Sequence, residues 1–180
     1  MDFNANVFID LYQDDKVIAH REVHNIMCNT GRLFALKRLT GQVSDVSFTP
    51  LNIFIIGDQG TANPSDADSL PLTPAATQTT INHEVLRTQL DYDGISYSPT
   101  DPNVDLNPIT LTVTSSLNSS DVDASLSYVG RISEAALISS NPTDALVYDM
   151  LVYTTFKAIP FDRNESVKFS VTWNIYATRS

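Results

Sequence analysis

The chain has 180 residues and a mass of 19.8 kDa, enough for one domain that buries a sizeable core without disulfides or a structural metal. A hydrophobic fraction of 42% and a charged fraction of 18% exclude a disordered chain. The 11 basic residues against 21 acidic ones give a net charge of -10. This balance argues against nucleic acid and against an anionic membrane surface as partners, because both bind clustered Lys and Arg.

The kinds of polar residue favour strands and turns over helices. The chain holds 17 Asp but only 4 Glu and 4 Lys, and Glu and Lys are the residues that populate exposed helix faces. No stretch approaches about 18 consecutive apolar residues, so we expect no transmembrane helix.

The first third of the chain predicts a hairpin followed by a helix. Residues 1–6 are expected to form a free N-terminal arm, and 7–12 and 16–26 to form two strands joined by a turn at 13–15. A helix is predicted over about residues 30–40, capped by Asn29 or Thr30. Leucines recur every third position in this helix, and a glycine follows it at position 41.

The middle third predicts one buried strand and a long loop. The apolar run 51–57 indicates a strand buried on both faces. The segment 58–80 is rich in Asp, Pro, Ser and Thr and predicts a long loop, a feature that in compact domains is usually functional. A strand is expected at 82–91, a tight turn at Asp93-Gly94, and an irregular stretch at 96–107.

The last third alternates between apolar and polar residues. This period of two predicts strands near 109–114 and 166–177, with the odd-numbered face of the last strand, including Trp173, in the core. The apolar segments 126–138 and 146–158 are also expected to form strands. The pattern as a whole predicts a mainly β fold, an antiparallel β-sandwich with one α-helix packed at an edge, as a single domain over 1–180.

The histidines and the one cysteine form no convincing reactive site. His20 and His24 are four residues apart, but on a strand this spacing is about 13 Å, too far for one metal ion. His83 stands alone. Cys28 follows His24 by four residues, and we interpret it as a small apolar residue ahead of the helix rather than as a nucleophile.

Two further patterns suggest ligands only weakly. The segment Gly57–Thr61 is similar to a phosphate loop but lacks the Lys and the following helix, so its glycines are expected to permit positive φ in a turn. Five aspartates that could bind calcium lack EF-hand spacing and are interpreted as solvated turn residues: Asp58, Asp66, Asp68, Asp121 and Asp123.

Glu84 and Glu134 are the carboxylates that could pair for glycoside hydrolysis. Arg87 and Arg131 lie three residues from them, so we expect two structural ion pairs instead. The N-glycosylation sequons at Asn118 and Asn164 could be used only if the protein were secreted. The sequence thus offers no catalytic, cofactor-binding or metal-binding residue, and we expect a protein that is not an enzyme and needs no cofactor.

Several short motifs follow one another along the chain. In chain order they are Asn25, Thr30-Gly31-Arg32, IFIIGDQGT (53–61), Leu72, Thr79, Ile81, Glu84 with Arg87, RISEAALI (131–138) and Trp173. Together these motifs resemble a structural module of tailed-bacteriophage virions. The resemblance covers most of residues 16–176, although Ala136 stands where the module often has Gly.

The resemblance implies a structural role and no catalytic residue. Such modules occur in capsid decoration proteins, head fibres and the attachment ends of tail fibres. It implies a virion protein assembled in the bacterial host cytoplasm, first a capsid decoration (cement) protein that binds the major capsid protein. The alternative is a tail or neck fibre-attachment or adaptor protein. A homo-oligomer is expected in either case, with a trimer on a three-fold axis of the particle as its form, and a carbohydrate-binding β-sandwich is the third hypothesis.

Overall fold

The computed structural model describes residues 2–39, 51–99, 101, 103, 109–118, 129–140, 148–162 and 167–178. Within these ranges the chain forms nine strands, one α-helix and one 3₁₀ turn. The elements are β1 (Asp2–Gln13), β2 (Lys16–Met27), α1 (Asn29–Leu39), β3 (Ile53–Gly57), β4 (Glu84–Gln89), η1 (Tyr92–Gly94), β5 (Ile95–Ser98), β6 (Ile109–Asn118), β7 (Val129–Ser140), β8 (Tyr148–Asp162) and β9 (Val167–Thr178).

The chain divides into two compact units. Unit 1 contains residues 1–25, 91–130 and 159–180, and unit 2 contains residues 26–90 and 131–158. The strands β2, β7 and β8 each pass from one unit into the other. That the two units form a single domain over 1–180 stays a prediction.

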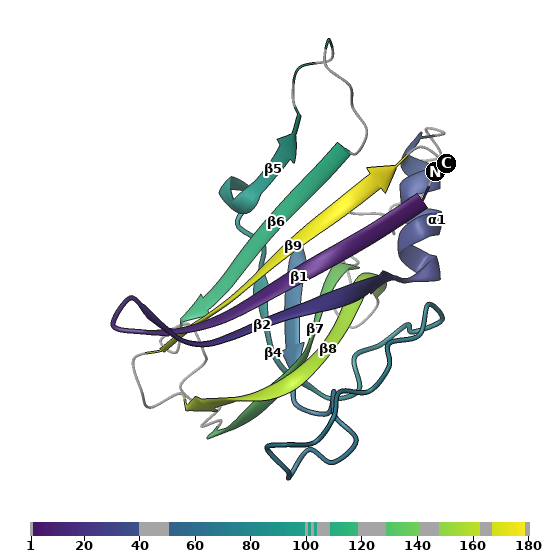
Figure 1. Cartoon of the computed structure of the whole chain (residues 1–180). Coiled ribbons are helices and arrows are strands. Elements are labelled where there is room, and N and C mark those ends of the chain that lie inside the picture. Colours follow the sequence, from purple (N-terminus) through teal and green to yellow (C-terminus); the bar gives the residue numbers. More distant parts are fainter. Residues whose placement is uncertain are drawn as a thin grey trace. The chain divides into compact units, whose positions relative to one another are not determined.

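Unit 1 is built on an antiparallel sheet in the order β2-β1-β9-β6-β5, whose strands run side by side in Figure 1. The predicted hairpin is confirmed, because Asp14 and Asp15 form a two-residue turn with φ of 50° and 61°. Two consecutive left-handed residues match the twist of the flanking strands, and Asp tolerates this conformation better than most residues.

The prediction of a free arm at residues 1–6 is wrong. Residues 2–6 belong to β1, which pairs with β9 from Asp2↔Thr178 onward and with β2 from Ala5↔Asn25 onward. The alternation that places Val7 in the core extends back to Ala5, a side chain too small to reveal the strand from the sequence.

The core of unit 1 lies on the odd-numbered face of its sheet. Val167, Phe169, Val171, Trp173 and Ile175 are all buried, as the alternation of β9 predicts. The ring of Phe169 meets that of Phe161 edge to face, with 6.5 Å between centroids. Trp173 is fully buried, so its indole is not available as a platform for a sugar ring.

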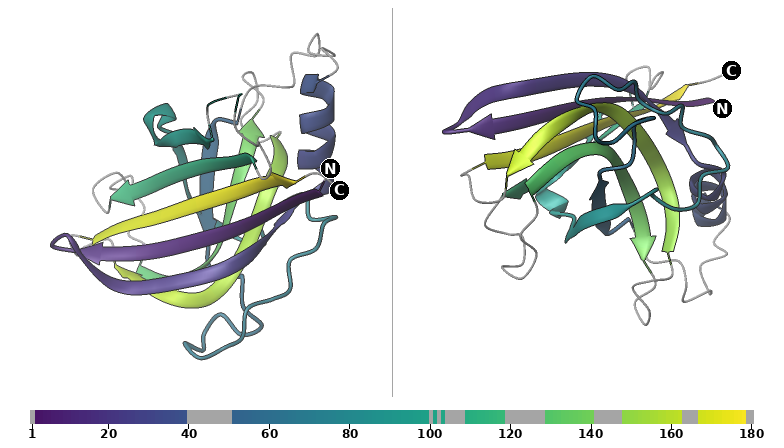
Figure 2. Two further views of the ribbon diagram at one scale, coloured as in Figure 1. Left: turned by 45° about the horizontal axis from the view of Figure 1, so that its top comes forward. Right: turned by 90° about the horizontal axis from the view of Figure 1, so that it is seen from below.

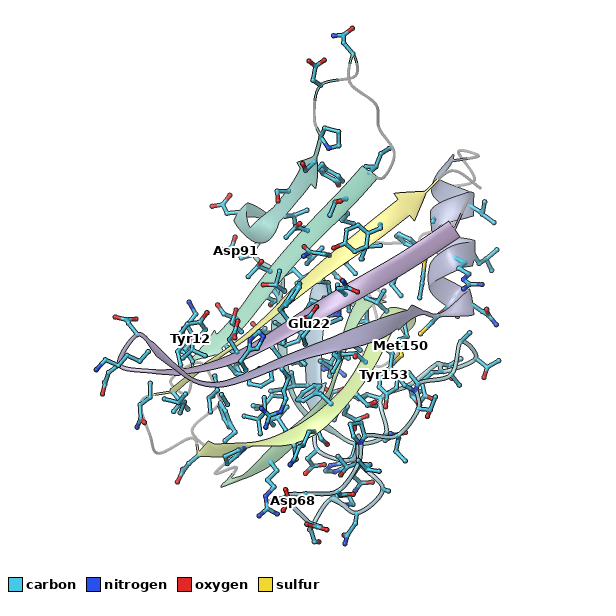
Figure 3. All side chains as sticks on the ribbon, in the orientation of Figure 1. Tyr12, Glu22, Asp68, Asp91, Met150 and Tyr153 are labelled. Atoms are coloured by element: carbon cyan, nitrogen blue, oxygen red, sulfur yellow. The ribbon has the colours of Figure 1, made fainter. Side chains whose placement is uncertain are left out.

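Unit 2 is built on strands in the order β4-β3-β7-β8, and the last two residues of β2 pair with β8. Every residue of β3 is buried, which confirms the prediction of a strand covered on both faces. Side chains of these strands and of neighbouring segments form a buried apolar cluster, which contains Cys28, Ile53, Ile55, Ile81, Ala136, Ile138, Met150 and Tyr153. Met150 and Tyr153 are labelled on β8 in Figure 3.

The N-terminus of helix α1 packs against β8, as Figure 2 shows. The first helical hydrogen bond runs from Arg32 N to Cys28 O, so Cys28 is the N-cap residue and the predicted caps, Asn29 and Thr30, already lie inside the helix. The Thr30 hydroxyl donates instead to the Met150 carbonyl. A Cβ on Gly31 would lie 2.3 Å from Leu151 O, so only glycine allows this approach.

The two leucines of α1 whose side chains are described are not buried. Leu33 and Leu36 are 51% and 59% exposed. The predicted cap at Gly41 lies outside the described residues.

The fold class is as predicted: a mainly β chain of the antiparallel β-sandwich class with two sheets and one short helix. Two local predictions differ from the structure. The tight turn at Asp93-Gly94 is the end of η1, and the stretch expected to be irregular from residue 96 begins with β5. Among the described residues, no helix is long and apolar enough to cross a membrane.

Candidate functional site

The centre of unit 2 holds a fully buried carboxylate, that of Glu134 on β7. Its Oε1 accepts hydrogen bonds from the backbone N–H groups of His83 (2.9 Å) and Gln59 (3.2 Å). Its Oε2 accepts from the Tyr153 hydroxyl (2.8 Å) and from the backbone N–H of Asn82 (3.0 Å). Both oxygens are therefore saturated by donors of the chain itself, as a buried charge requires.

Two glycines make room for this carboxylate. A Cβ on Gly57 would lie 2.6 Å from Glu134 Oε1 and 2.2 Å from His83 O, and one on Gly60 would lie 2.1 Å from Ser133 O. The Gly60 N–H donates to Ser133 Oγ at 2.9 Å. Neither glycine has a positive φ. The expectation of a left-handed turn is therefore wrong, and the glycines serve close approach of backbone to strand β7.

The long predicted loop is confirmed, and it is fastened along β7 and β8. Residues 58–83 contain only one isolated bridge, Thr61↔Pro71, and Figure 1 shows them as a long teal tube beside β8. Thr155 Oγ1 donates to Leu72 O at 2.5 Å and Arg131 donates to Ser65 O at 2.8 Å. The Leu72 N–H donates to Gly60 O at 2.8 Å.

A charged contact holds the outer end of the loop. Lys157 Nζ lies 2.7 Å from Asp68 Oδ1, and this contact lowers the pKa of Asp68, which is labelled in Figure 3. Because both side chains are largely exposed, the pair positions the loop more than it stabilises the fold.

The loop exposes its apolar side chains although its backbone is fixed. Leu70 is 77% exposed and Leu72 is 41% exposed. Asp66 caps the preceding turn, since its Oδ1 accepts from the Asp68 N–H at 2.9 Å. We call this segment the leucine loop (58–83): its backbone is hydrogen-bonded to β7 and β8, and its two leucines are exposed.

Two ionisable side chains of unit 2, Tyr153 and Cys28, are buried. Burial first, and then the neighbouring carboxylate of Glu134, raises the pKa of the Tyr153 phenol far above its usual value. Burial raises the pKa of the Cys28 thiol to about 11. Both groups are protonated at neutral pH, so Cys28 is the buried small residue that the sequence predicts.

Of the two predicted ion pairs, one is present and one is not. The guanidinium of Arg87 pairs with Glu84 through two contacts of 2.5 and 2.6 Å. Glu134 instead takes the four donors named above, and Arg131 reaches the loop carbonyl of Ser65. Residues three apart on a regular strand point to opposite faces, as Arg131 and Glu134 do on β7. Glu84 and Arg87 meet because the register of β4 shifts between them, where Ile56 pairs with Leu86 and Gly57 pairs with Glu84. With Glu84 and Glu134 engaged in this way, the chain's own donors occupy both candidates for glycoside hydrolysis.

The remaining candidates are scattered. His83 Nδ1 lies 2.7 Å from Asp58 Oδ1, and His20 Nδ1 lies 2.7 Å from Asp10 Oδ1. In the described part of the chain, no group of three or more His, Cys, Asp or Glu side chains could hold a metal ion. Asp121, Asp123, Asn164 and the side chain of His24 lie outside the described residues, and Asn118 ends β6 on an exposed position.

The sequence did not identify Tyr153 and Asn82 as partners of Glu134, because neither residue belongs to a recognisable motif. Asn82 Nδ2 donates to the Tyr153 hydroxyl at 3.0 Å and so completes the shell of the carboxylate. One signal was available: a lone Glu within the apolar and small residues of 132–138 predicts a buried charge that must find donors elsewhere.

Comparison of the chain with protein-family models, with curated proteins and with solved structures found no match.

Proposed function

We propose that this chain is a non-enzymatic structural protein of a tailed-bacteriophage virion, in the first place a capsid decoration protein that binds the major capsid protein. The alternative within the same class is an adaptor that attaches a fibre to the tail or neck. The proposal includes a homo-oligomeric arrangement, a trimer where the protein sits on a three-fold axis of the particle.

The observation that carries the proposal is the leucine loop. An apolar side chain on a loop usually folds back onto its own domain, because water contact with apolar surface is unfavourable. Here the backbone is fastened to β7 and β8 while Leu70 and Leu72 point outward. Such anchors in a polar surround are typical of a protein interface, in which a few side chains supply most of the binding energy.

The role of Glu134 is consistent with this proposal. A catalytic carboxylate needs a lone pair that faces the substrate, whereas both oxygens of Glu134 accept hydrogen bonds from the loop and from Tyr153. The segments that carry the resemblance to the virion module, 53–61, 81–87 and 131–138, meet around this carboxylate. In this proposal they shape the loop that binds a virion partner.

Fractionation of purified particles tests the proposal. Heads and tails of the phage that encodes this chain are separated and their proteins identified by mass spectrometry. Presence in the heads supports the decoration role, presence in the tails or necks supports the adaptor role, and absence from both refutes the proposal.

A variant pair tests the leucine loop itself. The double change Leu70→Ser with Leu72→Ser is expected to lower the amount of protein on particles at least tenfold, since two buried leucines contribute roughly 3 kcal/mol or more to an interface. The matched control is Ile18→Ser, an equally apolar and 52% exposed position on the hairpin β1–β2. Equal incorporation of the loop variant and the control into particles would show that the loop is not part of the interface.

A further inference from the structure

The sheet of unit 1 has a second face, formed by the even-numbered side chains of β1, β9, β6 and β5. The strand registers place even residues opposite even residues, as in Asn6↔Asn174 and Asn174↔Thr112. Directly opposed residues share a face, so this set forms one continuous surface. Its members are half-buried or exposed with the exception of Ser170, whereas the odd-numbered face is core. We call this surface the even face.

One end of the even face gathers rings around a carboxylate. Asp10 on β1 accepts a hydrogen bond from the imidazole of His20, with Nδ1 and Oδ1 2.7 Å apart. The ring of His20, whose side chain is 53% exposed, stacks on Phe8 with 6.5 Å between centroids and 24° between planes. Lys168 Nζ lies 6.0 Å from the centre of the Tyr12 ring. Tyr12 and Glu22 can be followed along β1 and β2 in Figure 3.

Tyr12 belongs to the same cluster. Burial, then the charge of Asp10 and a hydrogen bond to Asp10, raise the pKa of the Tyr12 phenol. Asp10 thus has an imidazole as its hydrogen-bond partner and raises the pKa of a nearby phenol, and its side chain remains 22% exposed. The result is a partly open carboxylate beside flat, partly exposed rings, which we call the Asp10 cluster (Phe8, Asp10, Tyr12, His20 and Lys168).

The rest of the even face is nearly free of charge. On β9, β6 and β5 its described positions hold one charged residue, Lys168, and otherwise hydroxyl, amide and phenol groups: Ser96, Ser98, Thr110, Thr112, Thr114, Ser116, Asn118, Ser170, Thr172, Asn174 and Tyr176. Thr112 donates to Asn174 at 2.8 Å, and Thr114 lies 3.2 Å from Thr172. These cross-strand contacts fix the polar groups before any ligand arrives, which lowers the entropic cost of binding.

This combination of groups fits a sugar. A pyranose ring presents an apolar C–H face, which packs on an aromatic ring, and an edge of hydroxyls, which donate well to a carboxylate. Tyr, Ser and Asn side chains supply adaptable hydrogen bonds to such a ligand. The net charge of -10 repels acidic polymers, and the mostly uncharged groups of the even face match an uncharged one.

We propose that the even face of unit 1 binds a neutral polysaccharide, with the Asp10 cluster taking one sugar ring and the Thr-, Ser- and Asn-lined part of β9 and β6 taking its neighbours. This role is separate from the proposed attachment through the leucine loop, which lies in unit 2. The buried Trp173 takes no part in it, and the rings that act are Phe8, Tyr12 and Tyr176.

Affinity electrophoresis of the purified full chain tests the proposal without any particle. Native gels contain dextran, mannan or galactan as neutral probes, and alginate as an acidic one. We expect at least one neutral polymer to retard the wild-type chain and alginate to have no effect. Asp10→Asn, which keeps the shape but removes the charge, should weaken the apparent affinity about tenfold, the loss of one charge-assisted hydrogen bond.

The matched control is Asp15→Asn. It makes the same chemical change in the hairpin turn, where φ is 61° and Asn is readily accommodated. Relative to its own migration in a gel without polymer, this variant should be retarded as much as the wild type by every probe. A thermal melt of both variants checks that they fold, and Phe8→Thr, a residue that suits a strand, provides a second change in the cluster.

Three outcomes would overturn the proposal. They are no retardation of the wild type by any of the three neutral polymers, equal retardation of the wild type and the Asp10 variant, and particle cross-links that place Tyr12 or Lys168 against a virion protein. None of the gel results depends on attachment to a virion, so failure here and failure of the proposed function are separate findings.

Discussion

The strongest test of the structure is the change Glu134→Gln. The native carboxylate accepts four hydrogen bonds, two at each oxygen, from Gln59, Asn82, His83 and Tyr153. A glutamine has the same shape, but one of its two oxygens becomes an NH₂ group, which can only donate. Two of the four native donors then face another donor in a site that excludes water.

The size of the effect follows from this count. A hydrogen bond to a charged group contributes about 1.5–3 kcal/mol, so the loss of two predicts a destabilisation of roughly 3–6 kcal/mol. Urea unfolding followed by far-UV circular dichroism measures it. The control is Glu84→Gln, which breaks a partly exposed ion pair with Arg87 and should cost about 0–1 kcal/mol.

Hydrogen exchange locates the damage. In the Glu134 variant, amide protection should fall first in residues 58–83, because the carboxylate holds the two ends of this loop at Gln59 and at Asn82 and His83. A cost below about 1 kcal/mol, or a loss of protection spread evenly over both units, would refute the reasoning that Glu134 organises the leucine loop.

Three further predictions follow from single residues. Trp173→Ala should destabilise the protein by about 3–5 kcal/mol in urea unfolding, because a fully buried indole leaves a large cavity; a cost under 1 kcal/mol would contradict its burial. Gly57→Ala should prevent the closure of the loop, since its Cβ would lie 2.2 Å from His83 O, and unchanged loop protection in hydrogen exchange would argue against this contact. The pKa of Cys28 is raised from 9.0 to about 11, so the folded state keeps a proton that the unfolded state loses. Stability should therefore be fully present below pH 9 and fall by roughly 2–3 kcal/mol as pH rises from 9 to 11, and Cys28→Ala should flatten this fall.

The sequence by itself determined the class of fold and most of the strands. A period of two in 166–177 predicted the buried Trp173, and the apolar run without alternation at 51–57 predicted a fully buried β3. Both predictions succeeded because the spacing of apolar residues reports which faces of a strand meet water. The helix and the hairpin followed from equally local signals. The strand at residues 2–6 escaped because Asn and Ala give no such contrast.

The tertiary structure alone decided what the polar residues do. Spacing paired Glu134 with Arg131, but the pleat of β7 sends them to opposite faces, and the true partners come from residues 51 to 75 positions away and from Tyr153 on the next strand. The same holds for Asp10 and His20, which become neighbours only through the register of β1 and β2. A local pattern cannot encode such pairs, because a hydrogen bond between distant segments depends on strand order and register, which the whole chain sets.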